Sequence, residues 1–247
     1  MDLKDYIPLK GSDSNFWYRA KLNLISFLLR NIDNKSGNAK ILDLGCGTGF
    51  EIDELLRFGD VSALDISKEA LDRIEARPGL TLLCADIEKH CLEKDKYDCV
   101  CCFDLLEHLK EDGQALKNIF NSLKKGGFLV FTVPAFPSLY SSHDLALGHY
   151  RRYSRKEIRG KVKAAGFTIN KTGYWNFIFF IFEAAVRILK NLFLVRLLGK
   201  KKFNSDMASY PKVINSFLFS ILNLEVVLIR NKFTFPFGLT IYGIAKK

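Results

Sequence analysis

Three glycines at alternate positions follow an apolar segment in the first quarter of the chain. The apolar segment is Ile41–Leu44, and the glycines are Gly45, Gly47 and Gly49. A short apolar run of this kind is typical of a strand that is buried on both faces. Glycine lets the chain turn sharply and lets a ligand approach the backbone, because no Cβ stands in the way. Together with the helical pattern that starts at Phe50, the segment predicts the strand–turn–helix unit of a nucleotide-binding α/β fold.

The spacing of these glycines narrows the class of ligand. A dinucleotide-binding fingerprint needs glycine at its first, third and sixth positions, whereas the sixth position here is Phe50. No Gly-Lys-Ser/Thr sequence ends the turn, which excludes a phosphate-binding P-loop. Two interpretations remain: a site for another nucleoside-containing cofactor, or a glycine-rich turn that binds nothing.

Two carboxylates follow the next two predicted strands. Asp65 ends the strand predicted at 61–65 and lies 20 residues after the first glycine. At that place an acidic side chain can accept hydrogen bonds from both hydroxyls of a ribose. The alternative is a helix N-cap, a role that Ser67 fills better. Asp86 follows the strand predicted at 80–85, and its alternative role is that of an ordinary loop acid.

A long loop, residues 134–153, follows the strand predicted at 128–133 and contains two histidines, an aspartate, two arginines and several tyrosines. In an open α/β sheet this loop faces the ligand crevice at the carboxyl ends of the strands. The imidazole of His149 could take a proton from a substrate hydroxyl, and arginines could bind a phosphate or a carboxylate. The alternatives are a structural histidine bonded to the backbone and arginines paired with loop acids. The predicted substrate-binding residues are His143, Arg151, Arg152 and Tyr153, and the predicted catalytic residue is His149.

Taken together, these motifs resemble the class I methyltransferases that depend on S-adenosylmethionine (SAM). The similar branch is the one that acts on small molecules, as the ubiquinone-pathway O-methyltransferases do. The resemblance covers about residues 13–175 and 236–247. It includes an acidic residue, Asp43, two places before the first glycine, and the pair Gly126–Gly127 before the fifth strand. The sequence lacks the Asn/Asp-Pro-Pro-aromatic motif of enzymes that methylate base amino groups, which weighs against a nucleobase N-methyltransferase.

The resemblance also implies roles for single residues. It implies that Asp86 accepts the amino group of adenine and that Ile66 flanks the adenine ring. The backbone of Phe103 would touch the methionine part of SAM, and Arg19 would reach its carboxylate unless it is an ordinary solvated arginine. The predicted cofactor-binding residues are Arg19, Asp43, Gly45, Cys46, Gly47, Gly49, Asp65, Ile66, Asp86, Ile87 and Phe103.

An acidic and imidazole-bearing segment, Asp104 to His108, follows the strand predicted at 97–103. The pattern acid-x-x-Glu-His supplies metal ligands in some relatives. The alternative is a helix start, where the helix dipole favours acidic residues. Because one short cluster is not a full ligand set, we predict no metal site.

The elements that must position these residues form one domain, residues 1–247. Strand and helix patterns alternate five times, which predicts an α/β fold with a doubly wound, mostly parallel seven-stranded sheet, as in Rossmann-like methyltransferases. The core is expected at about 38–175 and 236–247, with an amphipathic capping helix ahead of it at 13–31. A helical insertion, residues 176–233, precedes the last strand.

The charge of the chain is unevenly distributed. Residues 1–148 carry 18 lysines and arginines against 23 acidic residues, whereas residues 149–247 carry 19 against 4. A strongly basic half suits nucleic acid or an anionic membrane surface. Its aromatic residues lie in apolar helical runs instead of alternating with basic residues, which weighs against RNA.

The insertion contains two apolar segments, at 174–198 and 213–230. Charged residues interrupt both, Glu225 among them, so neither is expected to cross a membrane. Lysines Lys200–Lys202 lie between the two segments, and an apolar helix beside such cations can lie on an anionic bilayer. The alternative is a lid packed on the sheet.

We therefore predict an enzyme that moves a methyl group from SAM to a small or lipid-linked acceptor, with O-methylation favoured. The alternatives are an RNA or protein methyltransferase, or a non-catalytic scaffold with the same fold. The N-terminus lacks the pattern of a signal peptide, and Cys99, Cys101 and Cys102 are expected to be buried and reduced. These features favour the cytoplasm, with peripheral contact to the inner face of a membrane through residues 176–233.

Overall fold

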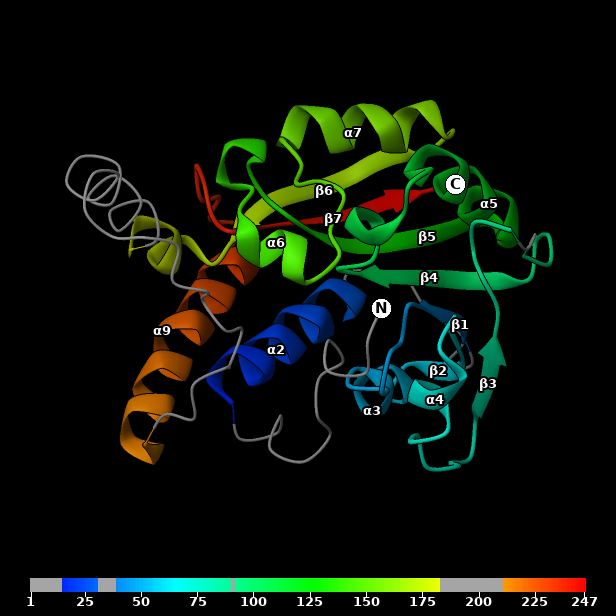
Figure 1. Ribbon diagram of the computed structural model, residues 1–247, viewed down its shortest axis with the longest axis horizontal. Coiled ribbons are helices and arrows are strands. Elements are labelled where there is room, and N and C mark those ends of the chain that lie inside the picture. The colour runs from blue at the N-terminus through cyan, green and yellow to red at the C-terminus, as the bar shows by residue number, and fades with distance from the viewer. Residues whose placement is uncertain (1–14, 31–38, 90–91, 183–210) are drawn as a thin grey trace.

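The computed structural model describes residues 15–30, 39–89, 92–182 and 211–247 (Figure 1). The middle of the predicted insertion, with Lys200–Lys202, lies outside the described residues.

A seven-stranded sheet in the order β3-β2-β1-β4-β5-β7-β6 forms the centre of the domain. The first five strands are parallel, and β7 runs antiparallel to both of its neighbours. The order reverses between β1 and β4, which is where an open α/β sheet binds its ligands. The strands are β1 (Ala39–Leu44), β2 (Gly59–Asp65), β3 (Leu80–Cys84), β4 (Tyr97–Phe103), β5 (Leu123–Pro134), β6 (Thr168–Trp175) and β7 (Thr240–Lys246).

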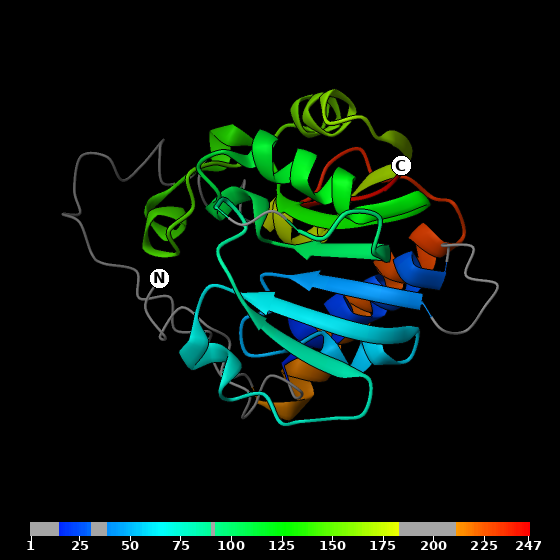
Figure 2. The ribbon, with the colours of Figure 1, turned by 90° about the vertical axis from the view of Figure 1, so that its right-hand side faces the viewer.

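Helices cover both faces of this twisted sheet, which confirms the predicted doubly wound fold (Figure 2). Helices α5 and α7 lie on one side, and α2 with α9 lies on the other. The α-helices are α2 (Phe16–Arg30), α3 (Ile52–Leu56), α4 (Lys68–Leu71), α5 (Asp112–Ser122), α6 (Ser142–Ala146), α7 (Arg155–Ala164) and α9 (Lys212–Arg230). Two short 3-10 helices, η2 (Leu106–His108) and η3 (Pro137–Leu139), follow β4 and β5.

The centre of the sheet is a dry apolar core. Strand β4 is buried almost throughout, and its cysteines Cys99, Cys101 and Cys102 are free thiols there, as the sequence predicts. Burial raises the pKa of Cys101 and Cys102 well above the ordinary thiol value, so these groups remain protonated packing residues.

One predicted boundary is wrong. The pair Gly126–Gly127, which the sequence places before the fifth strand, lies inside β5, because β5 begins at Leu123, opposite Tyr97 of β4. Extended pairing with a neighbouring strand has overridden the usual helix-ending role of glycine.

The described flanks of the insertion pack on the core. Residues 177–182 are helical, and the ring of Phe177 stacks on Phe235 and Phe237 at centroid distances of 5.2 and 5.0 Å. Glu225 of α9 is 2% exposed and accepts the backbone N–H groups of Phe177 and Ile178, at 2.9 and 3.0 Å. Its carboxylate thus satisfies free N–H groups at the start of that helix.

Candidate active site

The glycine turn lies at the carboxyl end of β1. Gly45, Gly47 and Gly49 have φ of 74°, 53° and 83°, a left-handed region in which a side chain is strained. A Cβ on Gly45 would also lie 2.8 Å from the side chain of Leu105. Glycine is therefore required here for the turn and for the close packing of the segment that follows β4.

Asp65, at the end of β2, faces this turn. The carboxylate is 6% exposed and accepts the N–H of Gly47 and the N–H of Ser67, both at 2.8 Å. A carboxylate at the end of this strand can accept hydrogen bonds from ribose hydroxyls, which is the role predicted for Asp65. The adjacent Ile66 is 61% exposed, an apolar side chain that an adenine ring could cover. Both placements fit the predicted roles.

The remaining cofactor candidates lie along the same edge. Asp86, after β3, accepts the N–H of Glu88 at 3.0 Å and pairs with Lys89 at 3.0 Å. Three further candidates, Cys46, Ile87 and Phe103, are 4%, 6% and 6% exposed. Because their side chains are buried, any contact with a cofactor would use their backbone.

The structure corrects the prediction for Arg19. Its side chain lies over the ring of Phe219 in α9, with the guanidinium carbon 4.0 Å from the ring centroid. The cation of α2 at the cofactor edge is Lys21, which is 4% exposed and lies 2.9 Å from Glu51 and 3.2 Å from Asp104. Burial alone would lower the pKa of Lys21, but the two carboxylates outweigh it and raise that pKa above its ordinary value.

A sequence signal for Lys21 did exist. It lies three and seven residues before Leu24 and Leu28, in line with the buried stripe of α2. A lysine in that stripe needs a buried partner, which is unusual for a surface helix.

Asp43 belongs to β1, two residues before the first glycine of the turn, and is 2% exposed. Its Oδ2 atom has no hydrogen-bond partner among the described residues, and burial, followed by the charge of Glu51, raises its pKa well above the ordinary value. Such an orphaned acid suits a ligand that brings a positive charge. SAM carries an ammonium and a sulfonium group, so the residues at this edge fit that cofactor.

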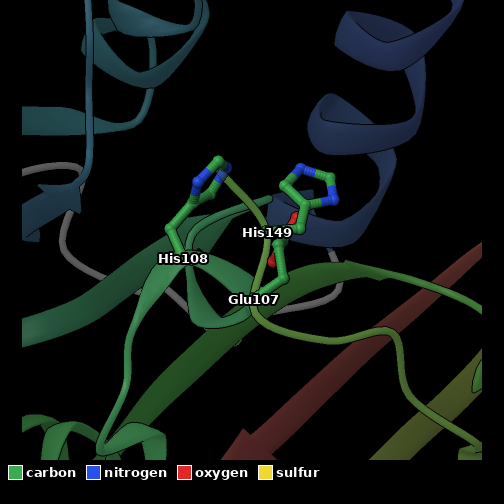
Figure 3. A group of neighbouring side chains, drawn as sticks. All are labelled: Glu107, His108 and His149. Atoms are coloured by element: carbon green, nitrogen blue, oxygen red, sulfur yellow. The ribbon is translucent and has the colours of Figure 1, made fainter. Parts of the chain in front are cut away.

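A second group of polar side chains lies beyond the end of β4. Glu107 and His108 come from η2, and His149 comes from the chain after α6; Figure 3 shows the three side chains converging. One potential ligand atom from each lies within 4.8 Å of the others. The backbone N–H of Tyr150 donates to the carbonyl of Glu107 at 2.8 Å, which holds the two segments together.

Glu107 is the least satisfied member of this group. It is 1% exposed, and its Oε2 has no hydrogen-bond partner among the residues that the structure describes. Burial, with a contribution from the charge of Asp104, raises its pKa well above the ordinary value. One carboxylate and two imidazoles are a donor set that binds divalent metal ions. The orphaned oxygen is therefore a structural reason to test for a cation, although the sequence predicts none.

Asp144 organises the neighbouring loop, and sequence reasoning missed it. The carboxylate is fully buried and accepts the N–H of Ser141 at 2.9 Å and the Nε–H of Arg152 at 2.6 Å. Its Oδ1 also lies 3.1 Å from Nδ1 of His149. Burial would raise the pKa of Asp144, but the hydrogen bonds from His149 and Arg152 outweigh it and hold that pKa well below its usual range. With Nδ1 engaged, Nε2 is the nitrogen of His149 left for a proton or a ligand.

The structure corrects the prediction for Tyr153. Its side chain is fully buried, and its hydroxyl donates to the carbonyl of Leu106 or to Asp112, at 3.0 and 2.8 Å. A substrate cannot reach it. Arg151 also pairs with Asp112, at 3.2 Å.

The other predicted substrate residues have mixed outcomes. Arg152 pairs with Asp144 of the same loop, the alternative that the sequence left open, whereas Arg151 pairs with Asp112 of α5. His143 lies exposed on α6. Of the polar residues predicted in the loop, His149 alone joins the converging group of Figure 3.

Comparisons with known proteins agree with this geometry. A family model described as a methyltransferase domain matches residues 16–172. The ubiquinone biosynthesis O-methyltransferase of Proteus mirabilis is 29% identical over 115 residues, which cover 44% of this chain and 46% of that protein. The match thus spans about half the length of that relative. A probable S-adenosylmethionine-dependent methyltransferase of Mycolicibacterium smegmatis is 23% identical over 69% of each chain.

Solved structures share the fold. An S-adenosylmethionine-dependent methyltransferase from Mesorhizobium loti superposes with a TM-score of 0.59 and 16% identity, covering 89% of this chain and 96% of that one. Phosphoethanolamine N-methyltransferase 2 of Haemonchus contortus, solved with S-adenosyl-L-methionine, gives a TM-score of 0.61 and 18% identity over all of this chain and 60% of that one. The family model matches more than half of the residues, and the orphaned Asp43 and the glycine turn fit the cofactor. The chain therefore belongs to the class I methyltransferases that use S-adenosylmethionine.

Proposed function

We propose that the protein transfers the methyl group of SAM to a hydroxyl of a small, partly apolar acceptor held beside His149. One observation carries this proposal: the two groups of side chains share the end of β4. Asp104, the residue after β4, lies 3.2 Å from Lys21 at the cofactor edge, and Glu107 of the converging group follows three residues later. A methyl donor at the first group thus lies next to an acceptor at the second.

The reaction is a direct displacement. An acceptor oxygen attacks the methyl carbon, the carbon–sulfur bond breaks, and the sulfur keeps the electron pair as S-adenosylhomocysteine leaves. The sulfonium is already an activated donor, so the protein mainly aligns the reactants and excludes water. The hydroxyl proton needs an acceptor, and Nε2 of His149, held in place by Asp144, can take it.

The surroundings of His149 suggest what kind of acceptor fits. Leu145 and Tyr150 are 66% and 58% exposed in the same loop and offer apolar contacts. Arg151 and Arg152 are already paired with carboxylates, which does not favour an acceptor with a strongly anionic group. The relatives named as ubiquinone biosynthesis O-methyltransferases support O-methylation. A lipid-linked acceptor would be the most apolar member of this class of small, hydroxyl-bearing acceptors.

The same residues fit a divalent cation, which is a second candidate property of the site. Glu107 would supply the oxygen that now lacks a partner, and His108 and His149 would supply ring nitrogens. When bound, a divalent cation lowers the pKa of a hydroxyl that it contacts. Calorimetry with Mn²⁺ on the wild type and on Glu107→Gln tests this property. Binding that the substitution abolishes supports it, and equal heats in both proteins contradict it.

The cofactor test comes first for the main proposal. SAM binding is measured by calorimetry for the wild type, for Asp65→Ala and for Asp72→Ala, a control in which the exposed acid that follows α4 is removed. We expect about 100-fold weaker binding for Asp65→Ala, because two hydrogen bonds to a charged group are lost, and no change for the control. A wild type that does not bind SAM would overturn the proposal.

The acceptor test separates the rival functions. The formation of S-adenosylhomocysteine from SAM is measured in the presence of each candidate acceptor. The acceptors are a panel of small phenols and catechols, total RNA and a protein extract. Turnover with the phenols supports O-methylation. Turnover only with RNA or protein favours the rival enzyme classes, and SAM binding without any turnover favours a scaffold.

A further inference from the structure

Helix α9 presents two opposite faces. Its buried residues are Leu222, Glu225, Val226 and Ile229. The exposed apolar residues Val213, Phe217, Leu224 and Val227 are spaced by four, seven and three residues, so they form one stripe along the other face. Their exposed fractions are 81%, 65%, 56% and 39%. We name these four residues the α9 stripe.

We propose that the α9 stripe binds the surface of an anionic lipid bilayer. An exposed row of large apolar side chains on a folded domain is unusual and marks a contact surface. Phe182 and Phe233, near the two ends of the described parts of the insertion, are also exposed, at 67% and 50%.

The helix is held on the domain, so it lies on a membrane instead of crossing it. Among the described residues it is the one helix long and apolar enough to span a bilayer, with 19 residues and a mean hydropathy of 1.7. However, Asn215 and Asn223 hydrogen-bond to Phe16 and Asn23 of α2, both at 2.8 Å. Together with the buried Glu225, these contacts keep one side of α9 against protein, and the stripe lies on the opposite, exposed side.

The charges around the stripe select the partner. Lys212 and Arg230 are the end residues of α9, Lys232 follows the helix, and all three are exposed. The single acidic residue in the sequence from 211 to 247 is Glu225, whose carboxylate is buried against residues 177 and 178. Within residues 211–247, which the structure describes, the face therefore has an apolar centre, a cationic rim and no exposed carboxylate. An anionic bilayer matches both features, whereas a second copy would bring two cationic rims together.

Co-sedimentation with vesicles tests the proposal on the full chain. Vesicles of phosphatidylglycerol and phosphatidylcholine in equal parts are compared with vesicles of phosphatidylcholine alone. We expect the wild type to bind the anionic vesicles at least tenfold more strongly, because each basic residue near the surface adds about fivefold. High salt should weaken that binding. A wild type that remains in the supernatant would overturn the proposal.

A variant of the stripe supplies the second arm of the test. The triple variant V213S/F217S/L224S should bind the anionic vesicles at least tenfold more weakly, whereas Leu82→Ser, which removes an exposed apolar residue of β3, should bind like the wild type. Equal binding of all three proteins would contradict the proposal, as would a dimer in light scattering that the triple variant dissociates in the absence of vesicles. SAM calorimetry on the triple variant shows that it is folded, and it keeps this test independent of methyl transfer.

Discussion

The cofactor side of the site is formed by backbone geometry, whereas the acceptor side is formed by side chains that hold other side chains. On the cofactor side, a turn at positive φ aims the N–H of Gly47 at Asp65. On the acceptor side, His149 is placed by Asp144, and Glu107 lies opposite with an oxygen that has no partner among the described residues. The first side should tolerate changes in its neighbours better than the second, because its shape depends on few side-chain contacts.

The largest effect is expected for Asp144→Ala. This change leaves Arg152 and His149 without their buried partner and removes the cap of α6. Breaking a buried ion pair costs about 3–5 kcal/mol, so the free energy of unfolding in urea should fall by about that amount. SAM affinity should change little. If the folded variant lost a comparable free energy of SAM binding, the cofactor side and the acceptor side would not be energetically independent.

A smaller effect is expected for Lys21→Met. SAM should bind about 100-fold more weakly, because the cation is lost and the carboxylates of Glu51 and Asp104 are left to repel an anionic ligand group. Arg19→Met is the matched control, since that arginine lies over Phe219 on the opposite side of the helix. Calorimetry measures both variants. A stronger effect for Arg19 than for Lys21 would restore the role that the sequence assigned to Arg19.

Local sequence patterns were sufficient for the sheet and for the position of the glycine turn, because glycine spacing and strand ends are themselves local. They failed where the contacts of a side chain depend on a residue that is distant in the sequence. Lys21, and not Arg19, is the cation at the cofactor edge, because the side chain of Arg19 packs over the ring of Phe219 in α9. Asp144 is one acid among several polar loop residues in the sequence, and only the fold buries it between His149 and Arg152.

The same reason explains the other errors on the acceptor side. A tyrosine in a polar loop is a reasonable candidate for binding a substrate. Tyr153 is nevertheless a core residue, because Asp112 of α5 lies within hydrogen-bonding distance of its hydroxyl. Glu107 and His149 are 42 residues apart in the chain, so their convergence could not be predicted from spacing.

Glu107→Gln should give a moderate effect that depends on pH. Burial raises the pKa of Glu107 in the folded state, so the folded protein retains a proton that the unfolded chain loses above a pKa of about 4.3. The stability of the wild type should therefore fall as the pH rises from that value towards the raised pKa. The variant lacks this dependence and should be the more stable protein at pH 7 by about 1–2 kcal/mol, with the difference vanishing near pH 4. Urea unfolding at both pH values measures this difference, and a variant that is less stable at pH 7 would indicate that the carboxylate is paired.

The smallest effect is expected for Ile66→Ser, and it tests whether side chains matter at all on the cofactor side. Ile66 is 61% exposed, so its loss should leave the free energy of unfolding unchanged within about 0.5 kcal/mol. If adenine covers it, the lost apolar contact is worth about 1 kcal/mol, or about fivefold in SAM affinity. Leu82→Ser, an exposed position on β3, controls for a general loss of surface hydrophobicity. A change in affinity equal to that of the control would place the adenine elsewhere and leave Asp65 and the glycine turn as the parts of this side that hold the cofactor.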